Sequence, residues 1–279
     1  MNRFVKLVHM EISRFWKLYA ALFVITVLTQ GAGVFFQARA YMNARNRDME
    51  TELLTDAQYI IKYGSHSFYN LLMDTSFWFI APIALSAAAL LLYTVFIWYR
   101  EWMGKNSFIY RLLMIPTARR NIYLAKLTAI MLLVFGLVAF QLVILPIEKL
   151  IYDWMIPSGL SEPMTILELI HYYPPFLILT PNNFIDFMLI YGLGLTFVII
   201  IFTVILLERS YRLKGFLAGL LYLLVIGLIM LIPLFTLANQ MKSYLYPVEL
   251  ASMELILALV IGLLSAWLGL YLVKNKVTV

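Results

Sequence analysis

Basic side chains that could bind another molecule are concentrated in one short stretch of this chain. Residues 100–126 read REWMGKNSFIYRLLMIPTARRNIYLAK, with six Lys or Arg among apolar residues. Pro116 disfavours helix at the residue before it, and Thr117 is a good N-cap for a following helix. The stretch therefore predicts a short helix, a turn at Pro116 and a second helix. Together they form an apolar and basic element suited to contact with a partner.

Residues for covalent, metal or nucleotide chemistry are missing from the sequence. There is no cysteine, no GxxxxGK[ST] phosphate-binding motif and no HExxH zinc motif. The three histidines (His9, His66 and His171) are far apart and have no ligand spacing. We therefore predict that the chain is not an enzyme and holds no metal or cofactor. Energy for any work it performs has to come from another subunit or from an ion gradient.

The elements that must position the basic stretch are apolar. The 279 residues are 63% hydrophobic and 13% charged, whereas soluble domains have about a quarter of their residues charged. Six charge-free runs reach the roughly 20 residues that a helix needs to cross a bilayer. They lie at about 18–38, 75–99, 127–147, 187–207, 215–238 and 255–273. The sequence thus predicts one all-α transmembrane domain over residues 1–279.

Flanking charges predict the orientation of these spans. Of the 21 Lys and Arg, 15 lie before the first span, in 100–126, in 208–214 or after the last span. Of the 15 acidic residues, 12 lie in the other three connecting segments. Cytoplasmic loops carry the excess of Lys and Arg, so both termini and the 100–126 loop are expected in the cytosol. Residues 148–186 are then expected outside.

The first 17 residues predict an amphipathic helix. At 100° per residue one face is apolar and carries Phe4, Val5, Val8, Ile12, Phe15 and Trp16. The opposite face is basic. Such a helix lies in the membrane interface and reaches anionic lipid headgroups. We expect interface contacts from Arg3, Lys6, Arg14, Trp16 and Lys17. The helix is either a simple anchor or a mechanical element that moves the first span.

Polar side chains inside the spans are few, and none is ionisable, which argues against an ion-driven carrier. Gln30 and Gln141 are the most costly to expose to lipid, because an unpaired amide loses its hydration. They, and Thr196, are candidates for lining a path, although hydrogen bonds between helices would satisfy them equally.

Two outer segments carry further expectations. Residues 43–63 are polar and predict either an extension of the first helix or a separate short helix. In 148–186 a helix is expected to begin at Ser161-Glu162-Pro163. This segment, with five acidic residues and one lysine, is either an interfacial helix or a lid that attracts a cationic amphiphile or peptide.

Residues 100–126 resemble the cytosolic loop of exporter-type (type-2) ABC transporter permeases. The similarity rests on an acidic residue and a glycine after a span, a Leu-Leu-x-x-Pro stretch, an Arg, and a Lys that opens the next helix. The span count and the amphipathic start are also similar to that family. One departure is the short segment 239–254, where many members have a long one.

The resemblance implies a permease subunit in a bacterial plasma membrane, surrounded by lipid and without a nucleic-acid partner. Its partners would be an ABC ATPase subunit and a second permease, identical or homologous. Seven residues would contact the ATPase or support that contact: Glu101, Arg111, Leu112, Leu113, Pro116, Arg119 and Arg120. The alternative is a membrane immunity or sensor protein that binds a partner in the bilayer and transports nothing.

Overall fold

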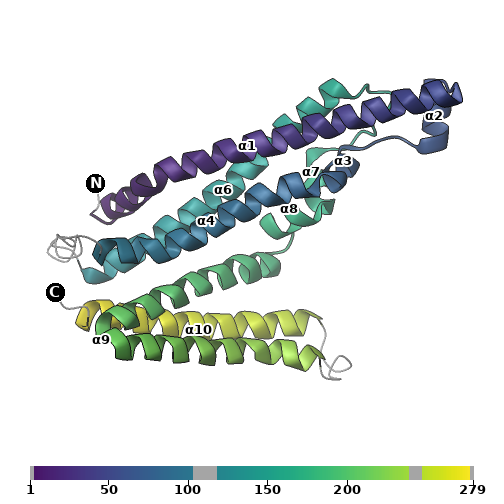
Figure 1. Cartoon of the computed structure of the whole chain (residues 1–279). Coiled ribbons are helices and arrows are strands. Elements are labelled where there is room, and N and C mark those ends of the chain that lie inside the picture. Colours follow the sequence, from purple (N-terminus) through teal and green to yellow (C-terminus); the bar gives the residue numbers. More distant parts are fainter. Residues whose placement is uncertain (1–2, 103–117, 239–246, 277–279) are drawn as a thin grey trace. The chain divides into compact units, whose positions relative to one another are not determined.

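The computed structural model describes residues 3–102, 118–238 and 247–276, which fold almost entirely as α-helices (Figure 1). The long helices are α1 (Arg3–Glu52), α4 (Ser76–Trp102), α6 (Arg119–Met155), α9 (Phe184–Ala238) and α10 (Pro247–Asn275). The short ones are α2 (Asp56–Tyr63), α3 (Phe68–Asp74), α7 (Ile166–Tyr172) and α8 (Pro174–Leu179). Five helices are long and apolar enough to cross a membrane. This agrees with the predicted all-α, multi-pass membrane protein.

Helix α1 joins the predicted interfacial helix and the first predicted span and continues beyond them. Residues 3–52 form one helix, so no helix boundary lies at Lys17 between the expected interfacial helix and the expected span. The segment contains no proline and continues beyond residue 38 with Ala, Arg, Met and Glu, which favour helix. It ends where Leu53 adopts a φ of 54°. Residues 43–63 combine both predicted alternatives, since α1 extends to Glu52 and α2 forms separately.

The chain divides into two compact units, and α1, α4 and α6 each contribute to both. Unit 1 comprises the described parts of Met1–Arg14, Leu90–Leu133 and Pro181–Val279, and unit 2 comprises Phe15–Ala89 and Val134–Thr180. The buried charges described below belong to unit 1, apart from one glutamate in unit 2.

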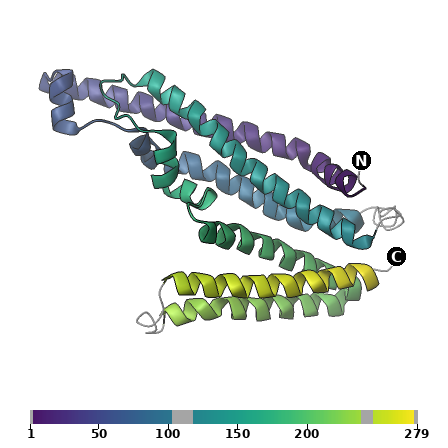
Figure 2. The same ribbon diagram turned by 180° about the vertical axis from the view of Figure 1, so that it is seen from behind.

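Helix α9 reverses direction inside unit 1 (Figure 1, Figure 2). The non-helical residue is Arg212, with φ 53° and ψ −127°. Immediately after it, a Cβ at Gly215 would collide with the backbone carbonyl of Leu207, so only glycine allows the two arms to approach this closely. The arms pack on each other and on α10 through Ile200, Ile226 and Ile261. The residues of the predicted spans 187–207 and 215–238 lie one in each arm, within the single candidate membrane-spanning helix Phe184–Leu231.

Unit 2 has a buried apolar core of its own. Aromatic side chains dominate it, and Phe68, Phe79, Tyr152, Tyr173 and Phe176 are all buried. Helices α3, α7 and α8 cover the end of this core. Two backbone hydrogen bonds join the segment before α3 to the segment between α6 and α7, from His66 N to Leu160 O (3.0 Å) and from Glu162 N to His66 O (3.1 Å).

The predicted helix start at Ser161-Glu162-Pro163 is wrong by several residues. Ser161 pairs with His66 in an isolated β-bridge, which holds the backbone extended there. The helix starts instead at Ile166, because Thr165 and Glu168 form a reciprocal capping box. A Thr-x-x-Glu pattern was present in the sequence and is the better start signal.

Candidate functional site

Three charged side chains from three helices meet inside unit 1. The ammonium of Lys126, near the start of α6, lies 2.6 Å from Glu11 Oε1 on α1 and 3.0 Å from Glu101 Oε1 on α4. It also donates to the carbonyl oxygen of Ile97 at 3.0 Å. The three residues are almost fully buried, with exposed fractions of 0%, 2% and 1% for Lys126, Glu11 and Glu101. All three donors of the ammonium are therefore satisfied within the protein.

Two arginines complete what we name the buried charge cluster (Glu11, Arg14, Arg100, Glu101 and Lys126). Arg14 donates to Glu101 Oε1 at 3.0 Å and Arg100 donates to Glu11 Oε2 at 2.9 Å. With three cations and two anions, the cluster has a formal charge of +1. Each buried carboxylate is therefore paired with at least one cation.

The backbone and an aromatic face hold the cluster in place. The hydroxyl of Tyr93 donates to the carbonyl oxygen of Glu11 at 2.9 Å, and the Lys126 ammonium lies 5.3 Å from the ring centroid of Trp98. Around it, Leu7 and Val8 of α1 pack against Ile122, Ala125 and Ala129 of α6. The start of α1 is thus fixed to α4 and α6 by charge and by apolar contact together.

A second polar contact joins the end of α4 to α9. The hydroxyl of Tyr99 donates to the carboxylate of Glu208. The guanidinium of Arg209 lies 4.7 Å from the ring centroid of Tyr99 and 5.4 Å from that of Trp102. Residues 208 and 209 come just before the reversal at Arg212, so the last turn of α4 holds both the start of α1 and the bend of α9.

The predicted ATPase-contact residues fall into two groups. Arg111, Leu112, Leu113 and Pro116 lie outside the described residues. Of the others, Glu101 is buried in the charge cluster, so it has no surface for direct contact and is limited to a supporting role. Arg120 is exposed, and Arg119 donates to the carbonyl oxygen of Lys274 at 3.3 Å.

The predicted membrane-interface residues also differ among themselves. Arg3, Lys6, Trp16 and Lys17 are exposed on α1. Arg14 is exposed as well, but its guanidinium also donates to the buried carboxylate of Glu101. The apolar face of the segment is likewise shared, because Val8 and Phe15 are buried in the protein while Val5 and Trp16 are exposed.

The predicted path-lining residues are satisfied by other helices. Gln30 and Gln141 form a reciprocal amide pair in unit 2, with N···O distances of 3.3 and 3.1 Å, and Gln30 donates also to Phe79 O. Thr196 is in unit 1 and donates to Ala258 O at 3.3 Å. Hydrogen bonding between helices therefore accounts for these side chains without a water-filled path.

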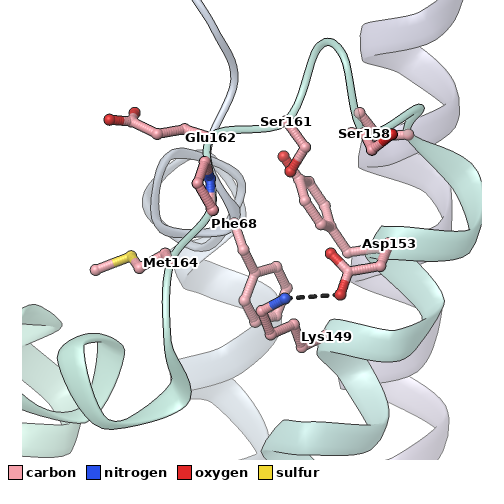
Figure 3. A pocket seen from close by; sticks show the side chains of 10 residues that line it. Phe68, Lys149, Asp153, Ser158, Ser161, Glu162 and Met164 are labelled. Carbon is pink, nitrogen blue, oxygen red and sulfur yellow. Dashed lines mark hydrogen bonds and ion pairs between the residues drawn. The ribbon is translucent and has the colours of Figure 1, made fainter.

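A pocket of about 270 Å³ lies in unit 2, between the end of α6, the first turn of α3 and residues 158–164 (Figure 3). The ammonium of Lys149 is paired with Asp153 at 2.6 Å on one wall. Phe68 lies beside this pair, and the Glu162 side chain extends away from it. The lining combines this ion pair with the apolar side chains of Ile156, Pro163 and Met164, and it indicates no particular ligand.

Glu11 is the member of the cluster that the sequence analysis missed. On a wheel of 100° per residue it lies about 20° from Phe4, at the edge of the apolar face. It is also the only acidic residue among the first 17. A lone carboxylate bordering an apolar face needs a cation as its partner when it is buried, and this signal could have marked Glu11 as a paired residue without identifying Lys126.

Replacing Lys126 by Met tests the energy of the cluster. The change leaves Glu11 and Glu101 buried without their shared cation, so we expect the free energy of unfolding to fall by about 3–5 kcal/mol. Lys149→Met, on the same helix, removes a pair whose lysine and aspartate are both partly exposed, and should cost less than about 1 kcal/mol. Unfolding of both variants in detergent measures the difference. Equal free energies of unfolding for the two variants would show that the buried cluster stabilises the fold no more than an exposed ion pair does.

Comparisons with known proteins add no family to these observations. No protein-family model, no curated protein and no solved structure matches this chain. Among the described residues, the buried charge cluster is then the feature on which a function can be argued.

Proposed function

We propose that this chain is the permease subunit of an exporter-type ABC transporter in a bacterial plasma membrane. The observation that carries the proposal is the buried charge cluster. It joins the start of α1 to the two helices that border residues 103–117, in a membrane protein without a nucleotide-binding motif of its own. A separate ATPase would supply the energy, and a second permease would complete the translocation path.

Six passes follow from the proposal if each arm of α9 crosses the bilayer. The reversal at Arg212, with Arg209 and Lys214 close to it in sequence, would then lie in the cytosol with both termini. The positive charge of these segments favours that orientation. Residues 39–74 and 148–186 would be outside.

Force from the ATPase would enter through residues 103–117 and reach three helices at once. Lys126, two turns into α6, is paired both with Glu101 in the last turn of α4 and with Glu11 of α1. Because an uncompensated buried charge is costly, these helix ends would move together instead of separating. The Tyr99–Glu208 contact would carry the same motion to the bend of α9. The amphipathic start of α1 would then be a mechanical element as well as an anchor.

Cysteine labelling tests the orientation, since the chain has no cysteine to interfere. Ile61 and Leu213 are equally accessible, with exposed fractions of 85% and 83%. We expect a membrane-impermeant maleimide to label Ile61→Cys on intact cells, and Leu213→Cys only after the membrane is permeabilised. Labelling of Leu213→Cys on intact cells would reverse the orientation. If it stayed unlabelled after permeabilisation, the bend would lie within the bilayer and the six passes would be lost.

Copurification with a Walker-motif ATPase encoded beside this chain tests the function. Leu112→Asp with Arg119→Glu should abolish the complex and its substrate-stimulated ATP hydrolysis, because it places negative charge on the expected docking surface. The matched control is Leu53→Asp with Arg47→Glu, which makes the same changes at exposed residues of the proposed outer side. This control should keep the complex.

Two results of that experiment contradict the proposal. The loop variant keeps the full complex and activity, or the wild-type protein binds no ATPase. The second result favours the alternative of an immunity or sensor protein that transports nothing.

A further inference from the structure

One glutamate of unit 2 is buried with no partner. Glu148, near the end of α6, has an exposed fraction of 1%. Neither of its carboxyl oxygens has a hydrogen-bond partner among the described residues. The cluster in unit 1 offers a direct contrast, because there every buried carboxylate faces at least one cation.

No cation of the described residues forms an ion pair with Glu148. Leu145 and Tyr152, one turn before and one turn after it on α6, belong to the apolar core of unit 2. Lys149 follows it in sequence but is paired with Asp153. On α1 and α2, Arg45 is bound to Asp56 and Lys62 to Glu52.

Among the described residues, Tyr173, between α7 and α8, is a titratable side chain near Glu148. The Tyr173 hydroxyl donates to the carbonyl oxygen of Leu72 on α3 at 3.3 Å, so it does not hold the carboxyl group. None of the described neighbours therefore supplies a donor to an ionised Glu148.

We propose that Glu148 is a proton-binding site: in this conformation it is a neutral carboxylic acid at pH 7. An isolated ionised carboxylate in an apolar site costs far more free energy than binding a proton from water. The bound ligand is therefore a proton, held between α6 and the helices that cover the end of the unit 2 core. This site is independent of the ATPase contact and would exist in a protein that transports nothing.

The conformation of unit 2 would then determine whether Glu148 holds its proton. A state that opens the cover of α3, α7 and α8 would hydrate Glu148 and release its proton, and closing the cover would take the proton up again. Alternatively, a cationic group of a bound molecule could replace the proton. Each opening of unit 2 would thus release one proton from Glu148, and each closing would bind one.

Infrared spectroscopy of the purified chain in lipid nanodiscs at pH 7 tests the site directly. We expect the wild-type protein to show the carbonyl stretch of one protonated carboxylic acid per chain. Glu148→Gln and Glu148→Met should both lose this signal. Both variants should unfold at the same temperature as the wild type or higher, because an uncharged side chain replaces an uncharged one.

Glu162→Gln is the matched control, since it removes an exposed glutamate of the same unit and should leave the signal intact. The proposal is overturned if the wild-type protein shows no protonated carboxyl signal at pH 7. It is also overturned if the signal survives in Glu148→Met. Because the signal reports a proton and not transport, its loss or presence is independent of the ATPase experiment.

Discussion

A charge buried in an apolar helical protein must be neutralised where it lies, and the contact of Lys126 with Glu11 and Glu101 does so for unit 1. The three residues come from α1, α4 and α6, so neutralising them joins three helix ends at one point. The apolar contacts of Leu7 and Val8 with α6 surround that point. Tyr99 and Glu208 then extend the connection to the bend of α9. In the proposed permease, this one constraint decides which helices move together when a partner pulls on residues 103–117.

The class of fold was readable from the sequence, because apolar runs of the length of a bilayer leave few alternatives to membrane helices. Helix ends were less predictable. Nothing in residues 39–52 differs from a helical sequence, so their polarity marked the end of the predicted span and left the end of α1 open between two alternatives. The start of α7 depends on whether Ser161 pairs with His66, and such a contact between distant segments leaves no periodic pattern.

Some residues of the candidate site were recognisable in the sequence, but their contacts were not, because those contacts also join distant segments. Lys126 and Glu101 were visible as the charges on either side of a basic loop, but their burial depends on how α1 packs on α6. Gln30 and Gln141 were recognised as costly to expose to lipid. They are 111 residues apart in the sequence, so only the folded structure shows that they are partners for each other. Glu11 and Glu148 are each a glutamate close to apolar residues in the sequence. Only the structure shows that Glu11 is paired with Lys126, whereas Glu148 has no partner among the described residues.

The coupling free energy between Glu11 and Lys126 tests the central claim most directly. A double-mutant cycle compares the unfolding free energies of the wild type, Glu11→Gln, Lys126→Met and the double variant. If the cluster joins the start of α1 to α6, the two effects are strongly non-additive, and the coupling is about 2 kcal/mol or more. Effects that add within about 0.5 kcal/mol would mean that the two side chains act independently, and would contradict the account.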